Sequence, residues 1–444
     1  MNPLLKSMMH SGAFARQVLT LVTGNAMAQL LLVGAVPIVS RLYCPADIGI
    51  QALFFSLVAM LSIAAAWRYP LAIVQAADDR EAIAVMKLSL ALILGTSGMV
   101  AALAFLAGPT LLRWAERPGL MPYIWCVPVA LMLASANQVY SFWTIRQKKF
   151  QLQSVARVGA SGAMVAVQIG LGWFGHATAG SLITGLVMGH VATALVYAAH
   201  GWRYDRRRFL APLAPGELRR AFWRYRQFPM YSMPGNLLNE AVSDVPTFLI
   251  TGYFGAAVTG FFAMARKGLG MPVTLISDAV SQVAHQRIAA ARNAGQPGFL
   301  IIAKVFCFLL LLIAGPMSIL MLWAPTLFGW IMGPGWVESG RFARALVPMY
   351  AMKFAVQPIT RAFLVYERQL GGLLWQAGYF LAAIACLAAG SWGFGEPVAA
   401  VWCYSVAAGL MYAVILALSI RWAGGKLGDL PKRLRFAPGA KEAV

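Results

Sequence analysis

Twelve long apolar stretches constrain the fold of this 444-residue chain more than any other feature of its sequence. A helix needs about 20 apolar residues to cross a bilayer, and each stretch reaches that length. None shows the period-two alternation of a barrel strand, so each is expected to be a helix. The expected spans are 18–40, 48–75, 84–107, 121–143, 152–174, 178–200, 229–253, 256–284, 299–324, 341–366, 370–391 and 396–421. The sequence therefore predicts an all-α integral membrane protein with about twelve transmembrane helices.

Positive charge alternates between the successive connections of these spans. When a residue within seven positions of a span end is counted with the adjoining connection, five of the 36 Lys and Arg residues belong to the odd-numbered connections and three lie deep inside apolar stretches. The other 28 belong to the two ends or to the even-numbered connections. Short loops rich in Lys and Arg stay in the cytoplasm. We therefore predict that both termini and 201–228 are cytoplasmic, and that 108–120 and 325–340 face the outside.

The net charge of +21 could suggest a nucleic-acid-binding protein, but the arrangement of the charge argues against that class. The basic residues form short caps between apolar runs, and no continuous basic stripe with interleaved aromatic residues is present. Only 11% of the residues are charged, against about 25% in a soluble domain. We expect the basic caps to face anionic lipid headgroups, and we expect no nucleic-acid partner.

The longest cytoplasmic connection carries eight arginines and divides the spans into two groups of six. The predicted organisation is a six-helix bundle at 1–200, the basic connection at 201–228, a second six-helix bundle at 229–421 and a basic cytoplasmic tail at 422–444.

The two halves share a spacing of small and polar residues. Gly24-Asn25 is followed 25 positions later by Gly49, and Gly235-Asn236 is followed 25 positions later by Gly260. Because six is an even number, both halves enter the membrane from the same side. The pattern predicts two six-helix bundles related as parallel repeats, an arrangement typical of transporters that bind substrate between the halves.

Polar side chains interrupt several spans, although a charge within a span costs a few kcal/mol and usually faces a bundle interior or a wet cavity. The candidates for lining a central substrate cavity are Asn25, Arg41, Arg68, Asn236, Asn239, Arg266 and Lys353. The candidates for coupling to an ion are Glu240, Asp244 and Asp278. The alternative is that these residues bond to neighbouring helices or, for Arg68, that the guanidinium reaches the cytoplasmic headgroups.

The types and spacing of these residues favour an anionic substrate. Asn236, Glu240 and Asp244 are four residues apart and share one helix face. One arginine side chain can donate two parallel hydrogen bonds to two oxygens of a phosphate, so cations facing a cavity suit a phosphate-bearing ligand. No catalytic, metal-binding or nucleotide-binding motif is present, and we expect no enzymatic residues and no cofactor.

Several of these residues belong to motifs that resemble those of a known family. Pro37 and the run Arg41-Leu42-Tyr43-Cys44-Pro45-Ala46-Asp47-Ile48-Gly49 resemble the "P…RLY-x-P-x-D-x-G" opening of oligosaccharide and polysaccharide flippases. The run Trp67-Arg68-Tyr69-Pro70-Leu71-Ala72-Ile73-Val74 is similar to the family's "RY-E-x-A-I-V" segment. Further similarities are Phe228-Pro229-Met230-Tyr231, Pro234, Asn239, Pro246, Phe254-Gly255, Gly260, Arg266, Pro272 and Val280-Ser281-Gln282-Val283. Throughout its length the chain resembles the O-antigen or exopolysaccharide flippase branch of the multidrug/oligosaccharidyl-lipid/polysaccharide (MOP) exporter superfamily.

The resemblance implies a function and a set of contacts. Such proteins have two helix bundles around a central cavity and move undecaprenyl-pyrophosphate-linked oligosaccharides outward across the bacterial inner membrane. Carried over to this chain, Arg41, Arg68 and Arg266 would contact the headgroup. A polysaccharide polymerase and chain-length machinery are candidate partners, and a proton or sodium is a candidate coupling ion. Pro70 stands where the family often has Glu, and Asp244 stands where many members have a neutral polar residue, so the chain departs from the family's pattern at two positions that bear on ion coupling.

Two other functions compete with the flippase. One is a cation-coupled small-molecule antiporter of the multidrug type in the same superfamily. The other is a membrane-embedded polysaccharide polymerase or ligase. A polymerase or ligase needs acidic or histidine residues on a sizeable external loop, and none of the predicted external connections is of that kind.

Overall fold

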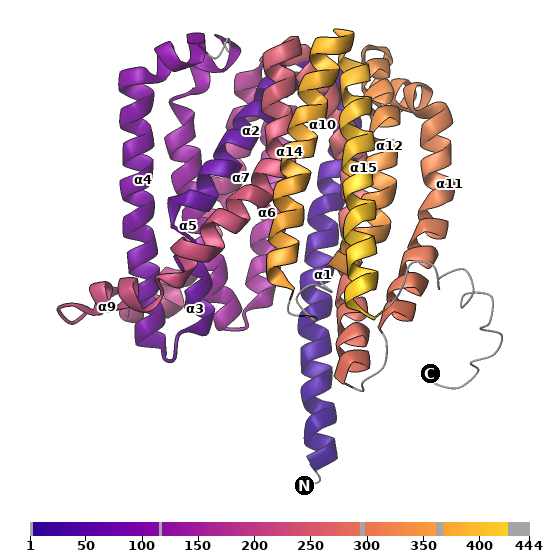
Figure 1. The fold of residues 1–444 in the computed structure, drawn as a ribbon. Helices are drawn as coiled ribbons and strands as arrows, with labels where there is room; N and C mark the ends of the chain where they lie inside the picture. Colours follow the sequence, from indigo (N-terminus) through magenta and orange to yellow (C-terminus); the bar gives the residue numbers. More distant parts are fainter. Residues whose placement is uncertain (1–2, 115–117, 294–297, 361–365, 367, 425–444) are drawn as a thin grey trace. The chain divides into compact units, whose positions relative to one another are not determined.

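The computed structural model describes residues 3–114, 118–293, 298–360, 366 and 368–424, and these are almost entirely helical (Figure 1). The long helices are α1 (Pro3–Leu42), α2 (Pro45–Ala65), α4 (Asp79–Trp114), α5 (Cys126–Arg146), α6 (Phe150–Trp173), α7 (Ala179–His200), α10 (Met233–Asn293), α11 (Phe299–Met332), α12 (Val337–Thr360), α14 (Gln369–Phe394) and α15 (Pro397–Trp422). The shorter ones used below are α3 (Ala72–Gln75), α8 (Arg206–Leu210) and α9 (Glu217–Arg224). Within the described residues, nine helices are long and apolar enough to cross a membrane.

Each of the twelve expected spans overlaps one of the long helices, and α10 overlaps two of them. The expected span 48–75 is too long, because α2 ends at Ala65 and is followed by a turn, a 3₁₀ helix and α3. The backbone of α10 leaves helical geometry at Gly255, with φ 84° and ψ 179°. That conformation is open essentially to glycine alone, so the residue type accounts for the break. The break separates the expected spans 229–253 and 256–284, and the prediction of an all-α membrane protein is confirmed.

The described chain forms two compact units, Met1–Gly260 and Phe261–Val444, which are called unit 1 and unit 2 below. In unit 1, α1 packs on α6, α6 on α7 and α4 on α5, and α9 lies across α4. In unit 2, α12 packs on both α11 and α15, and α14 packs on α15. The division falls inside α10 rather than in the 201–228 connection, and the predicted bundle boundaries remain a prediction.

A close contact inside unit 1 links the two glycines of the predicted repeat. A Cβ atom at Gly49 would lie 1.8 Å from the carbonyl oxygen of Ala256, and one at Gly260 would lie 1.8 Å from that of Pro45. Pro45 and Ala256, like Gly49 and Gly260, are 211 positions apart in the sequence. The contact is therefore reciprocal, as at a two-fold axis between equivalent elements. Glycine at both positions lets the backbones of α2 and α10 touch.

Candidate functional site

The chain leaves α2 through a strained turn that carries Arg68. Trp67 and Arg68 both lie in the left-handed region, with φ of 51° and 60°. For residues other than glycine this conformation costs about 1–2 kcal/mol each. Pro70 follows in a short 3₁₀ turn, Tyr69–Leu71. Proline has no N–H to donate, so it cannot continue the hydrogen-bond pattern of a helix. Strain of this kind is concentrated at functional sites, which makes the turn a candidate.

The turn directs the Arg68 side chain toward α10. Its Nη2 donates to Oδ1 of Asn236 over 2.8 Å, and its charge interacts with the Glu240 carboxylate one helical turn further along. Its buried Nε atom has no hydrogen-bond partner among the described residues. The guanidinium is thus held on one side by an amide and keeps a donor for a further acceptor.

Asp244 continues the same face of α10. It is 5% exposed, and its Oδ1 accepts a 3.0 Å hydrogen bond from the Ser56 hydroxyl of α2. Asn236, Glu240 and Asp244 therefore form a polar ladder facing α2 and its turn. We call Ser56, Arg68, Asn236, Glu240 and Asp244 the Arg68 cluster. The structure brings together four of the predicted site residues in this cluster.

Other predicted site residues of unit 1 lie apart from the contacts of this cluster. Oδ1 of Asn25 accepts a hydrogen bond from Arg157 of α6. Arg41 is exposed, and its Nη1 donates to the Pro37 carbonyl over 3.5 Å. Asn239 is exposed on α10. Both asparagines of the repeat motif, Asn25 and Asn236, accept from an arginine.

Unit 2 holds the remaining predicted cations. The Arg266 guanidinium lies 5.6 Å from the centre of the Phe262 ring, and the Lys353 ammonium lies 5.6 Å from that of the Tyr350 ring. The charges of Arg266 and Lys353 also act on one another. Among the described residues, no carboxylate pairs with Lys353. The Asp278 side chain lies outside the described residues, so its predicted role stays a prediction.

A tyrosine network near these cations was not predicted from the sequence. Tyr379 and Tyr412 pack 5.5 Å apart between ring centres, and Trp375 stacks on Tyr379 at 5.7 Å. The Tyr379 hydroxyl donates to Sδ of Met349 over 3.9 Å. Tyr379 and Tyr404 interact electrostatically, and Tyr404 also interacts with Arg266. All three tyrosines are less than 8% exposed. Tyr404 and Tyr412 are eight positions apart on α15. That helical spacing was the sequence signal that the two side chains share one face of the helix.

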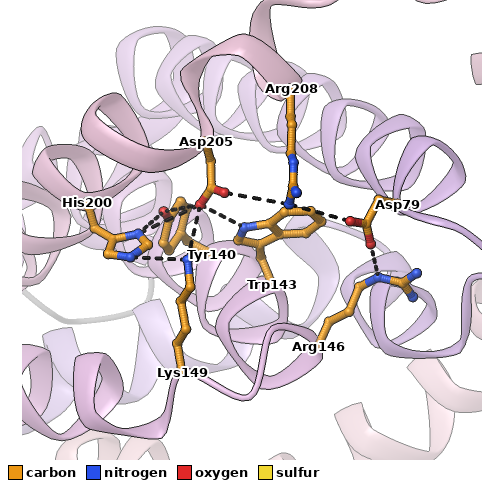
Figure 2. Close-up of polar contacts among 8 residues, drawn as sticks. All are labelled: Asp79, Tyr140, Trp143, Arg146, Lys149, His200, Asp205 and Arg208. Atoms are coloured by element: carbon orange, nitrogen blue, oxygen red, sulfur yellow. Dashed lines mark hydrogen bonds and ion pairs between the residues drawn. The ribbon is translucent and has the colours of Figure 1, made fainter.

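A second unpredicted network joins the basic connection to the helices of unit 1 (Figure 2). Asp205 is 3% exposed and accepts from the Trp143 indole nitrogen over 3.2 Å. His200 Nδ1 lies 3.7 Å away, and the charged atoms of Lys149 and Arg208 lie 4.0 Å away. Arg208 reaches on to Asp79, which also accepts from Arg146 over 3.1 Å. In the sequence, the available signal for this network was Asp205, the one aspartate of the arginine-rich connection 201–228.

The family of the chain follows from its sequence. The profile of a family described as polysaccharide biosynthesis protein matches residues 38–341, more than half of the chain. The chain belongs to the polysaccharide biosynthesis protein family. The stretch includes Arg41, the whole Arg68 cluster and Arg266, but not Lys353. A comparison with curated protein sequences yields no match.

Solved structures resemble this polysaccharide biosynthesis protein over nearly its whole length. The lipid II flippase MurJ in an inward closed conformation matches with a TM-score of 0.70 at 11% identity, covering 93% of this chain and 89% of that one. An inward-facing MATE family multidrug resistance transporter of the MOP superfamily matches with 0.68 at 14%, covering 92% and 96%. A MOP superfamily transporter from Pyrococcus furiosus matches with 0.59 at 16%, covering 94% and 96%. The chain has the fold of MOP superfamily transporters, which confirms the resemblance seen in the sequence.

Proposed function

We propose that this chain is a flippase that moves undecaprenyl-pyrophosphate-linked oligosaccharide repeat units outward across the bacterial inner membrane. Membership of a polysaccharide biosynthesis family supports a substrate that carries sugar. The fold is also that of a solved structure named as a lipid II flippase, which supports a lipid-linked one. O-antigen or exopolysaccharide synthesis would consume the translocated product.

The observation that carries the proposal is the placement of cations on apolar helices or directly after one, in both units. Arg68 follows α2, Arg266 lies on α10 and Lys353 lies on α12. Cations within membrane-spanning helices, such as Arg266 and Lys353, are costly unless they face water or an anion. A pyrophosphate supplies two or more negative charges, and bidentate contact with arginine is strongest where water is scarce. A drug exporter for cations would instead favour carboxylates and aromatic rings without arginines.

Transport of a defined lipid tests the proposal. The purified protein is reconstituted into vesicles with fluorescent undecaprenyl-pyrophosphate-oligosaccharide, and a membrane-impermeant quencher reports its movement. Movement above that of empty vesicles is expected. Movement of a fluorescent cation without movement of the lipid would contradict the flippase and support the antiporter.

The Arg266→Ala variant examines the role of the cations. Loss of the guanidinium should abolish lipid movement, while the amount of protein in the membrane stays near normal. Arg266→Lys should restore part of the activity, because the charge remains but the bidentate geometry does not. Normal transport at normal abundance in the alanine variant would eliminate Arg266 as a ligand. Depletion of that variant from the membrane, with normal transport per molecule, would assign Arg266 to folding.

A further inference from the structure

A polar pocket opens beside the start of α10 in unit 1, outside the Arg68 cluster. It has a volume of about 450 Å³. This lies within the range of about 300–1,000 Å³ found for small-molecule sites. Its polar lining consists of the amides of Gln75 and Gln227, the Ser232 hydroxyl, the Arg224 guanidinium and the phenol groups of Tyr225 and Tyr231. No acidic side chain is among its lining residues.

This lining has the chemistry that suits a sugar. Amide and hydroxyl groups both donate and accept, as the hydroxyl groups of a sugar do. The exposed Tyr231 ring offers an apolar face to the C–H face of a pyranose, with a polar edge at the hydroxyl. Gln75, Gln227 and Tyr231 are exposed, so a ligand can reach them.

Glu81 of α4 orients two of the lining side chains from behind. Its Oε1 pairs with Nη1 of Arg224 at 2.8 Å. Burial, followed by the Glu81 carboxylate, raises the pKa of Tyr225, so this side chain also lies close to Glu81. The site is therefore shaped before a ligand arrives, which lowers the entropic cost of binding.

The pocket adjoins the Arg68 cluster through one residue. The Ser232 carbonyl accepts from Nδ2 of Asn236 over 2.7 Å, and Oδ1 of the same amide accepts from Arg68 over 2.8 Å. Ser232 and Asn236 are one helical turn apart, which is about 5.4 Å along the axis. A headgroup could therefore lie with its phosphate near Arg68 and its first sugars in the pocket.

We infer that this pocket binds the sugar part of the lipid-linked oligosaccharide while Arg68 binds its phosphate. The inference rests on the proposed function and adds a second, sugar-reading contact to it. Recognition by two adjacent sites would let the protein discriminate a loaded lipid carrier from an empty one, because only the loaded carrier fills both.

Binding of two defined lipids to the full-length protein in detergent tests the inference. The probes are undecaprenyl pyrophosphate and the same lipid bearing N-acetylglucosamine, with affinities measured by native mass spectrometry. The wild-type protein should bind the glycosylated lipid about tenfold more tightly, the effect of one or two additional hydrogen bonds. Gln75→Ala and Gln227→Ala should each reduce that ratio and leave the affinity for the bare lipid unchanged. Arg68→Ala should weaken both lipids to a similar extent.

Gln151→Ala on α6 is the matched control, since Gln151 is also exposed and does not line the pocket. It should preserve the tenfold ratio. Equal affinity of the wild-type protein for both lipids would overturn the pocket inference and leave the flippase standing. An unchanged ratio in both pocket variants would also overturn it. Failure of the wild-type protein to bind either lipid would instead contradict the proposed function, and with it this inference.

Discussion

Charged side chains are treated differently at the basic connection of unit 1 and on helices α10 and α12 of unit 2. Asp205 in unit 1 meets an indole N–H, an imidazole and two cationic side chains. Lys353 in unit 2 meets the Tyr350 ring and the like charge of Arg266. The first arrangement compensates a charge several times over, and the second brings positive charges together.

The difference separates a charge that stabilises the fold from one that is kept for a ligand. Removing one partner from a buried, compensated network leaves the other charges uncompensated, which is expensive. A cation held close to another cation lowers stability until an anion arrives, and such conflicts are typical of functional sites. On this interpretation, substitutions in the two regions should affect stability with opposite signs.

The largest effect is expected for Asp205→Ala. It removes the carboxylate that Trp143, His200, Lys149 and Arg208 approach, and should lower the free energy of unfolding by about 3–5 kcal/mol. The measurement is thermal unfolding of the purified protein, with transport normalised to the surviving molecules. Glu338→Ala is the matched control, because its pair with Arg341 is exposed and worth at most about 1 kcal/mol. Equal melting temperatures for the two variants would remove the contrast between the regions.

A smaller effect of opposite sign is expected for Lys353→Met. The substitution keeps the apolar stem of the side chain and removes the charge beside Arg266, so the melting temperature should rise by about 2 °C. Lipid transport should fall about tenfold, the loss of one charge contact of about 1.4 kcal/mol. The same vesicle assay measures it. A lower melting temperature with normal transport would make Lys353 a structural residue. The contrast between the Asp205 network and the cations of unit 2 would then be wrong.

The smallest effect, a change in labelling rate, is expected at Cys44. Its polar contact lies near water, so it resembles neither the compensated charge of Asp205 nor the neighbouring cations of unit 2. Partial desolvation of its sulfur atom, then the hydrogen bond to Asp47, raises the pKa of the exposed Cys44 thiol. Its Sγ donates to Oδ2 of Asp47 over 2.9 Å. A raised pKa means less thiolate at pH 8, so maleimide should label Cys44 more slowly than glutathione and accelerate as the pH rises.

Asp47→Asn provides the comparison for this thiol. With the accepting carboxylate replaced, the thiol pKa should fall and labelling at pH 8 should quicken by a few fold. The measurement uses a variant in which the other four cysteines are alanine. Labelling at the rate of glutathione in the parent protein would exclude a raised pKa. Cys44 lies in the first connection between the expected spans, which is odd-numbered like 108–120 and 325–340, so labelling from outside intact cells would also support the predicted topology.

The helices were predictable because lipid leaves a long apolar run few choices. A span must satisfy its own backbone hydrogen bonds, so length and composition alone indicate a helix. The break at Gly255 was likewise anticipated, since the apolar run is interrupted at that position. The polar ladder of Asn236, Glu240 and Asp244 follows from helical spacing in the same way.

The partners of these side chains were not predictable. Arg68 reaches Asn236 across 168 positions of sequence, through two left-handed residues that no local pattern announces. The bond between Ser56 and Asp244 and the burial of Asp205 depend equally on contacts between distant helices. Sequence spacing reports on neighbours along one helix and carries no information on which faces meet.

The sequence by itself determined that the chain is a bundle of membrane-spanning helices with related halves, because hydrophobic length, charge distribution and repeated glycine spacing are local properties. Only the tertiary structure decided that Gly49 and Gly260 touch backbone reciprocally, that Arg68 is held by an amide beside a sugar-sized pocket, and that Lys353 is placed beside another cation. Those outcomes depend on the side-chain packing of helices against one another, where a shift of one residue turns a different face toward the neighbour.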